Sequence, residues 1–205
     1  MKKEKGIFFV MLAIVFIFAS LFFDAVLIKY ISFLRNTALD SFFMGITLVS
    51  SEIIIFFVLT SLFLWSEKKR KWILPLWVSL GLSVIVSLIL KITVQRARPF
   101  QLGIVPLLSS LQEASFWTWN FSFPSFQSML AFCAIPILSE QFPKLKKFWI
   151  AFAILVAFSR VYFGLHFVSD VITGGLIGYL IGIIIVREEK DNKFGEKIYN
   201  KIFRK

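Results

Sequence analysis

The only histidine of the chain, His166, lies in the stretch SRVYFGLHFVSD over residues 159–170. Arg160 precedes it by six residues and Asp170 follows it by four. On a helix, residues four apart share a face, so Asp170 can accept the hydrogen of one ring nitrogen and leave the other nitrogen to attack. The competing interpretation is a buried structural histidine beside an Arg160–Asp170 ion pair.

Elsewhere in the chain, further cations and the start of a predicted helix could bind phosphate together with this segment. We call these residues the phosphate-binding set. Lys91 and Arg98 lie in KITVQRARPF, and with Arg160 they supply three positive groups, two of which are guanidinium forks that suit phosphate oxygens. In FPSFQSM, the amides of Ser125 and Phe126 at a helix N-terminus would add an anion-binding end. Each feature alone fits a snorkelling cation or an ordinary helix start. Together with a nucleophilic histidine, they indicate phosphoryl transfer through a phosphohistidine.

The elements that must position these residues are membrane spans. The chain has 205 residues, is 58% hydrophobic with 26 Phe, and has a mean hydropathy of +0.82. This composition predicts an all-α integral membrane protein with one domain over 1–205 and a charged tail over 187–205. Apolar stretches near the required length of about 20 residues predict six transmembrane helices. They cover approximately 6–23, 43–65, 72–95, 124–140, 148–165 and 167–186.

The distribution of Lys and Arg predicts the orientation of these spans. Of the 23 Lys and Arg residues, 17 lie on one side of the predicted membrane: at the N-terminus, in the loops 66–71 and 141–147, and in the tail. The positive-inside rule therefore places both termini in the cytoplasm and the phosphate-binding set at the extracytoplasmic face of the cell membrane. We interpret the net charge of +11 as a topology signal and expect no nucleic-acid partner.

Three further segments have predicted roles. The segment 26–42 has apolar residues near helical spacing and is expected to form an interfacial helix. The loop 101–123 carries Trp117 and Trp119, aromatics typical of headgroup level. Gly174 and Gly178 are four apart, which indicates close helix packing, either within the bundle or at a homodimer face.

The cysteine and histidine counts bear on metal chemistry. Cys133 is the single cysteine, so the chain can form no intramolecular disulfide and no cysteine-based metal site. With only one histidine, a zinc site with its usual three or four ligands is also disfavoured. We expect neither a metal nor another cofactor.

The spacing of these residues resembles that of the type 2 phosphatidic acid phosphatase family, the membrane lipid phosphate phosphatases. Lys91 is followed by six residues and then Arg98-Pro99, and Ser159-Arg160 is followed by five residues, His166, three residues and Asp170. Both match the family's pattern. The matching motifs span about 91–170, and the six predicted spans are compatible with the family over nearly the whole chain.

The resemblance implies a role for each residue. Lys91, Arg98 and Arg160 would bind the phosphate, and Ser125 would contribute to that pocket. His166 would be the nucleophile and Asp170 its orienting partner. The family needs no metal.

The middle motif departs from the family. Where the family has Pro-Ser-Gly-His, this chain has Pro124-Ser125-Phe126-Gln127. The family's histidine there is assigned as the general acid that protonates the leaving oxygen. Gln127 cannot titrate, and loss of general acid catalysis typically costs about 10²–10⁴-fold in rate. If the substrate is a diphosphate, Gln127 would instead donate a neutral hydrogen bond to the bridging oxygen.

Three interpretations of Gln127 remain open. A polyprenyl (undecaprenyl- or dolichyl-type) diphosphate would need the acid least, because its leaving phosphate has a second pKa of about 6; this is the favoured substrate, ahead of a phosphatidic acid-type monoester. Alternatively, Glu113 or an ordered water replaces the acid. Finally, the chain could be an inactive relative that binds or transports a lipid phosphate, with Glu52 lining a pathway through the second span.

Overall fold

The computed structural model describes residues 2–107 and 121–203, and all the regular elements in this part of the chain are helices. Glu113, Trp117 and Trp119, which the sequence singles out, lie outside the described residues. The helices are α1 Lys2–Ser32, α2 Thr37–Val49, α3 Glu52–Leu64, α4 Glu67–Arg70, α5 Ile73–Val94, α6 Phe126–Gln141, the 3₁₀ turn Pro143–Leu145, α7 Lys146–Tyr162, α8 Val168–Asn192 and α9 Phe194–Phe203.

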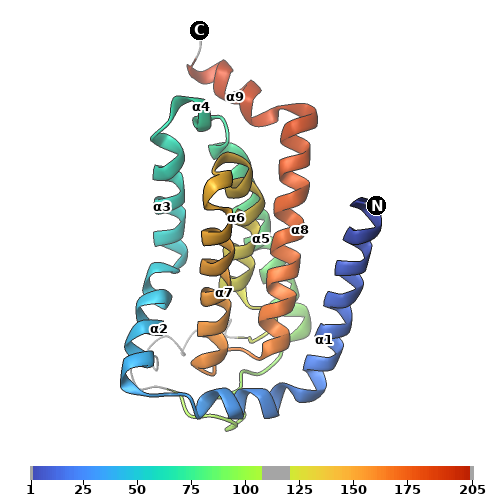
Figure 1. Cartoon of the computed structure of the whole chain (residues 1–205), viewed down its shortest axis with the longest axis vertical. Helices are drawn as coiled ribbons and strands as arrows, with labels where there is room; N and C mark the ends of the chain where they lie inside the picture. The colour runs from blue at the N-terminus through green and yellow to red at the C-terminus, as the bar shows by residue number, and fades with distance from the viewer. Residues whose placement is uncertain (1, 108–120, 204–205) are drawn as a thin grey trace.

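The long helices form a bundle whose two ends differ (Figure 1). Helices α3, α5, α6, α7 and α8 run along the long axis, and α6 packs against α5, α7 and α8. Helix α1 descends beside α8, and its C-terminal part passes beneath the lower end of the bundle. The short helices α4 and α9 lie at the opposite end, near the C-terminus. The lower end therefore brings together the end of α7, the start of α8 and the loop that follows α5.

Glycines bring α8 against α6. A Cβ atom at Gly178 or Gly182 would collide with a backbone carbonyl oxygen of α6, and one at Gly174 with that of Ser125, the N-cap residue of α6. These glycines recur every four residues, so they form one stripe along α8, and the lack of side chains lets the two backbones meet. The predicted packing role of Gly174 and Gly178 is therefore confirmed, and their stripe is used within the bundle rather than at a homodimer face.

Length and composition identify two or three candidate membrane spans among the described residues. Among the described residues, Glu67–Val94 and Val168–Asn192 are long and apolar enough to cross a bilayer, and α2 with α3 would add a third span if the pair acts as one. Helices α6 and α7 are shorter, at 16 and 17 residues. Six spans remain a prediction.

The segment between α1 and α3 differs from the sequence-based expectation. The predicted interfacial helix over 26–42 is not one element, because its first part completes α1 and its last part begins α2. Asn36 separates the two, and its side chain accepts a hydrogen bond of 3.0 Å from the amide of Leu39, which caps α2. The predicted span over 43–65 is likewise divided between α2 and α3, which are bent by 63° at Ser50 and Ser51.

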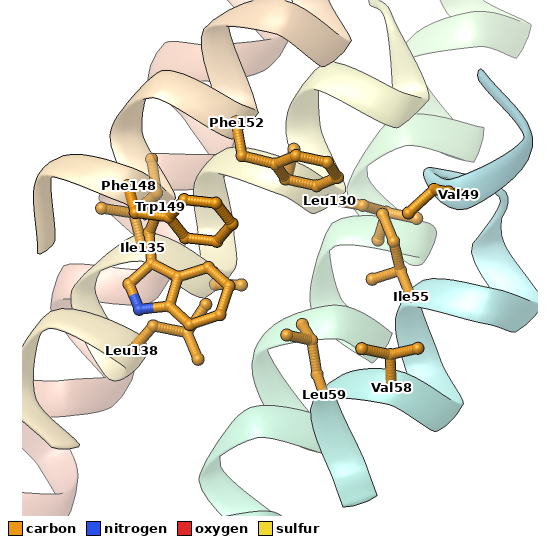
Figure 2. A pocket seen from close by; sticks show the side chains of 12 residues that line it. Val49, Ile55, Val58, Leu59, Leu130, Ile135, Leu138, Phe148, Trp149 and Phe152 are labelled. Atoms are coloured by element: carbon orange, nitrogen blue, oxygen red, sulfur yellow. The ribbon is translucent and has the colours of Figure 1, made fainter. Parts of the chain in front are cut away.

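An apolar cavity of about 260 Å³ lies between α2–α3 and α6–α7 (Figure 2). Its lining is hydrocarbon and aromatic, with Ile55, Leu130 and Phe152 among the side chains that face it. No ionisable residue of the described part of the chain lines this cavity, so these residues supply no group for phosphoryl chemistry there.

Candidate active site

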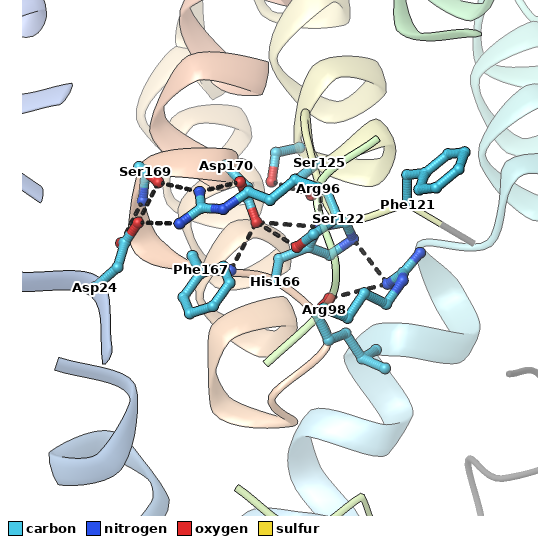
Figure 3. A network of polar contacts seen from close by, with 12 residues as sticks. Asp24, Arg96, Arg98, Phe121, Ser122, Ser125, His166, Phe167, Ser169 and Asp170 are labelled. Carbon is cyan, nitrogen blue, oxygen red and sulfur yellow. Dashed lines mark hydrogen bonds and ion pairs between the residues drawn. The ribbon is translucent and has the colours of Figure 1, made fainter. Parts of the chain in front are cut away.

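Three segments far apart in sequence meet at the lower end of the bundle (Figure 3). They are the loop after α5, the segment that precedes α6, and the turn between α7 and α8. Gly164, at φ +72°, lets that turn reverse, and the amides of Leu165 and His166 both donate to the carbonyl oxygen of Arg160. The sequence around His166 thus folds as a tight connection rather than as a continuous helix, and it holds the imidazole at the start of α8.

His166 is buried, with 1% of its surface exposed, and two partners define its protonation. Its Nδ1 lies 2.6 Å from the carbonyl oxygen of Ser122, and its Nε2 lies 3.2 Å from Nη1 of Arg98. A carbonyl only accepts and a guanidinium only donates. Nδ1 therefore carries the hydrogen, and the Nε2 lone pair is directed toward Arg98.

Asp170 acts on His166 from a distance rather than through a direct hydrogen bond. Its Oδ2 lies 3.8 Å from Nδ1 of His166, beyond hydrogen-bonding length. The carboxylate accepts instead from Nη1 of Arg96 at 2.7 Å, from the amide of Phe167 at 2.8 Å, and from the hydroxyl of Ser122. The expectation that Asp170 takes the ring hydrogen is thus replaced by a backbone carbonyl in that place, with the aspartate as a fixed negative charge beside the ring.

Arg96 joins Asp170 to helix α1, a link that sequence reasoning missed. Its Nη2 pairs with Asp24 at 2.8 Å, and its Nη1 donates to the hydroxyl of Ser169 at 2.7 Å. Asp24 also accepts from the amide of Ser169 at 3.0 Å, and the guanidinium lies 4.0 Å over the ring of Phe167. The one available signal was Asp24 itself, a carboxylate directly after the first apolar stretch, but no motif spacing connects it to Arg96.

The three predicted phosphate-binding cations surround the same place. Lys91 is buried and donates 2.5 Å to the carbonyl of Phe121, and Arg98 donates 3.0 Å to the carbonyl of Leu165. Arg160 is buried in α7 and donates 3.1 Å to the hydroxyl of Ser50 at the α2–α3 bend. The Nε of Arg160 is buried with no hydrogen-bond partner among the described residues, so this guanidinium retains donor capacity for an anion.

The electrostatics of the site favour a neutral histidine. Burial holds the pKa of His166 well below its usual range, and the positive charges of Arg98 and Lys91 lower this pKa further. Burial also lowers the pKa of Arg98 to about 10, which leaves it charged at neutral pH. The arrangement therefore presents an unprotonated Nε2 among cations at neutral pH, as nucleophilic attack on an anionic phosphorus centre requires.

The start of α6 differs in part from the predicted anion-binding end. Ser125 is buried, and its amide donates 3.0 Å to the backbone carbonyl of Asp170, so this amide is already occupied. Phe126 begins α6 and is partly buried. Gln127 donates from Nε2 to Oε1 of Glu52 at 2.9 Å. The middle motif therefore places Gln127 next to a carboxyl group contributed by α3.

No cluster of three or more His, Cys, Asp or Glu side chains that could hold a metal ion occurs in the described part of the chain. Cys133 is fully buried in α6. The polar centre seen in Figure 3 therefore consists of one histidine, two carboxylates and several cations.

Comparison with known proteins identifies the family. The PAP2 superfamily model matches residues 72–193, which include every predicted site residue from Lys91 to Asp170. The chain belongs to this superfamily of type 2 phosphatidic acid phosphatase-like proteins.

Sequence relatives agree with this assignment. The chain is 35% identical over 129 residues to phosphatidylglycerophosphatase B of Bacillus subtilis, which covers 57% of this chain and 58% of that protein. It is 33% identical over 86 residues to an uncharacterised protein of Methanocaldococcus jannaschii, covering 40% of this chain and 35% of that protein. The chain thus aligns with less than two thirds of the length of these curated relatives.

Solved structures extend the likeness to the whole fold. A transmembrane PAP2-type phosphatidylglycerolphosphate phosphatase from Bacillus subtilis superposes with a TM-score of 0.70 at 26% identity, covering 92% of this chain and 96% of that one. LpxE of Aquifex aeolicus superposes with a TM-score of 0.64 at 29% identity, covering 80% and 94%. These likenesses and the apolar helices make this chain a membrane protein of the same architecture.

Proposed function

We propose that the protein is a metal-independent phosphatase that removes phosphate from a membrane lipid phosphate or diphosphate through a phosphohistidine at His166. The observation that carries the proposal is the orientation of the imidazole. Nδ1 donates to Ser122 at 2.6 Å, so the Nε2 lone pair faces the cations that would hold the phosphate. Neither a passive binding pocket nor a transport site requires a histidine fixed in one tautomer.

The first step transfers the phosphoryl group to the protein. Lys91, Arg98 and Arg160 hold the phosphate oxygens, and Nε2 of His166 attacks phosphorus as the bond to the leaving oxygen breaks. The ring retains its Nδ1 hydrogen and so becomes positively charged. Asp170, 3.8 Å away, stabilises this charge through its fixed carboxylate.

The second step regenerates the histidine. Water attacks phosphorus, the P–N bond breaks, and inorganic phosphate leaves with the water oxygen. His166 returns to the neutral tautomer with its lone pair on Nε2. The cations that stabilised the first transition state serve the second, because both develop negative charge on the same phosphoryl oxygens.

The absence of a titratable group at Gln127 favours a polyprenyl diphosphate among lipid substrates. A phosphate leaving group needs little protonation, and Gln127 would donate a hydrogen bond to the bridging oxygen. The names of the Bacillus subtilis relatives indicate a phosphate monoester for those proteins, so a phosphatidic acid-type monoester is the second candidate.

The test of this function is inorganic phosphate release by the purified protein in detergent with a metal chelator present. A polyprenyl diphosphate and a phosphatidic acid are offered side by side, with His166→Ala as the control. We expect release that the chelator does not reduce and that the variant lacks. Release that continues in His166→Ala, or no release from either lipid, would contradict the proposal.

We also propose six spans with both termini in the cytoplasm and the site at the extracytoplasmic face. The basic residues of α4 lie at the end of the bundle opposite the site, which supports this orientation (Figure 1). A cysteine at exposed Leu102 should react with a membrane-impermeant maleimide in intact cells, whereas one at exposed Lys68 should react only after lysis. The reverse pattern would overturn the orientation.

A further inference from the structure

We propose that Glu52 donates a proton to the leaving oxygen of the substrate. It would thereby fill the general-acid role that Gln127 cannot fill, because Gln127 does not titrate. The inference rests on the proposed function and adds a catalytic residue to it. It also extends the substrate range from diphosphates, which need little acid, to lipid phosphate monoesters, which need more.

The backbone bend between α2 and α3 places Glu52 at the site. Glu52 is the first residue of α3, directly after the 63° break. Gln127, in the first turn of α6, donates from Nε2 to its Oε1 at 2.9 Å. An amide N–H donor fixes one carboxyl oxygen and leaves the other oxygen of the carboxyl group to carry a proton. Gln127 thus orients a proton donor, although it cannot itself be one.

The same bend connects Glu52 to the phosphate-binding cations. Ser50, two residues before Glu52, is buried and accepts the 3.1 Å hydrogen bond from Arg160. Exposed Glu52 is therefore hydrogen-bonded to Gln127 on α6 and lies two residues from Ser50, the hydrogen-bond partner of Arg160 on α7.

An apolar cavity continues from Glu52 between α3, α5 and α6. It has a volume of about 290 Å³, and among the described residues Glu52 is the only ionisable one that lines it. The other lining residues are Ile53, Ile55, Phe56, Phe57, Leu80, Val84, Phe126 and Leu130. A hydrocarbon chain suits such a lining. Because the leaving oxygen of a lipid phosphate carries the lipid tail, a proton donor for that oxygen has to lie beside a tail groove. Glu52 borders this groove and accepts a hydrogen bond from Gln127 at the start of α6.

The proton balance closes over the two steps. In the proposed cycle the carboxyl group of Glu52 holds a proton when the first step begins. As Nε2 of His166 bonds to phosphorus, the P–O bond to the lipid breaks and the Glu52 proton passes to the leaving oxygen, which departs as an alcohol. In the second step water attacks phosphorus, the P–N bond breaks, and the protons of the water leave with the phosphate. The solvent then returns a proton to the Glu52 carboxylate, so Glu52 acts only in the first step.

The competing interpretation is structural. A carboxylate at the first position of a helix is favourable to the helix dipole, and a hydrogen bond to Gln127 would merely join α3 to α6. A structural role predicts equal loss with every substrate, whereas a proton donor matters only when the leaving group needs a proton. The dependence on the leaving group therefore separates the two.

The experiment compares Glu52→Gln with wild type on two substrates. One is a phosphatidic acid, whose alkoxide leaving group needs a proton, and the other is p-nitrophenyl phosphate, whose nitrophenolate does not. We expect Glu52→Gln to lower kcat on phosphatidic acid by about 10²–10⁴-fold and to leave p-nitrophenyl phosphate hydrolysis within a few-fold of wild type. Gln127→His added to Glu52→Gln should restore much of the lost activity, because it returns a titratable group to the same position.

Glu67→Gln is the matched control. Glu67 also begins a helix, but it lies in α4 at the opposite end, and its side chain is 83% exposed. We expect wild-type activity from it on both substrates. Equal losses on both substrates in Glu52→Gln, or no loss on phosphatidic acid, would overturn the role of Glu52. If wild type hydrolyses neither substrate, the proposed function itself is contradicted, and this outcome is distinct from a failure at Glu52.

Discussion

The chemistry of His166 depends on which ring nitrogen carries the hydrogen, and its two neighbours differ in hydrogen-bonding character. The carbonyl of Ser122 can only accept, and the guanidinium of Arg98 can only donate. Neither contact involves a group that titrates near neutral pH. The tautomer is therefore set by partners whose protonation does not change during the reaction.

We propose that Asp170 acts on this histidine through its negative charge. Asp170→Asn keeps the shape of the side chain but removes the negative charge that faces the phosphorylated ring at 3.8 Å. We expect kcat to fall on the order of 10²-fold or more, with a much smaller change in KM, because the charge acts on the transition state. Steady-state phosphate release measures this. Activity within twofold of wild type would show that the carboxylate is not needed.

The buried histidine makes stability depend on pH. Its pKa is well below 6.5 in the folded protein, so below about pH 6.5 the unfolded chain binds a proton that the folded chain does not. Stability should therefore fall as pH decreases from 7, by up to about 1.4 kcal/mol per pH unit from this group. Thermal unfolding in detergent at pH 7 and pH 5.5 measures the change. His166→Asn, which cannot titrate, should show a smaller decrease, and an equal decrease would contradict this origin.

At the scale of elements, the site depends on how closely α8 approaches α6. The amide of Ser125 donates to the carbonyl of Asp170, a backbone contact between the two helix starts. Side chains along the glycine stripe would prevent it, since Gly174 meets the carbonyl of Ser125. The stripe therefore holds the first turn of α8, and Asp170 with it, against the start of α6.

Gly178→Ala tests this packing. Its new methyl group would meet the backbone of Met129, so we expect a loss of about 1–3 kcal/mol in stability, with lower activity. Gly81→Ala in α5 is the control, because a Cβ there has nothing within 4 Å, and it should stabilise the helix by about 0.5–1 kcal/mol. Thermal unfolding of both variants measures the difference. Equal behaviour of the two would contradict close packing at Gly178.

The spacing of the motifs predicted which residues lie in the site, but it did not predict the contacts that these residues make. The spacing of Lys91, Arg98, Arg160, His166 and Asp170 identified residues that the structure brings to one end of the bundle. The backbone carbonyl that replaces Asp170 as partner of Nδ1 leaves no sequence signature, because every residue has a carbonyl. The Asp24–Arg96 pair joins residues 72 apart through the packing of α1, and no local pattern encodes that distance.

Over the whole molecule, the bend at Ser50 and Ser51 shows why apolar length alone does not define the helices. The stretch over 43–65 is apolar enough to be read as one span. The helix bends next to Ser50, whose hydroxyl accepts a hydrogen bond from buried Arg160. A buried guanidinium needs such acceptors. The bend in turn directs Glu52 toward Gln127. The polar residues inside this apolar stretch thus mark the bend that positions Glu52.

The two ends of the molecule contain different groups. The lower end, under which α1 passes, contains the histidine, the carboxylates and the cations that we propose to bind phosphate (Figures 1 and 3). At the other end, Glu189 accepts from the amides of Gly195 and Glu196, and Lys71 pairs with Glu196 at 3.0 Å, which secures α9 to the bundle. The phosphoryl chemistry that we propose therefore lies at one end of the bundle.

The central claim, a phosphohistidine at His166, is tested most directly by trapping that intermediate. Purified protein is mixed with a lipid phosphate carrying ³²P, quenched within milliseconds, and the protein-bound label is treated with acid or alkali. We expect wild type to carry label that acid removes and alkali does not, as a phosphorylated imidazole behaves, and His166→Ala to carry none. Label that survives in His166→Ala, or phosphate release without any labelled protein, would contradict the account.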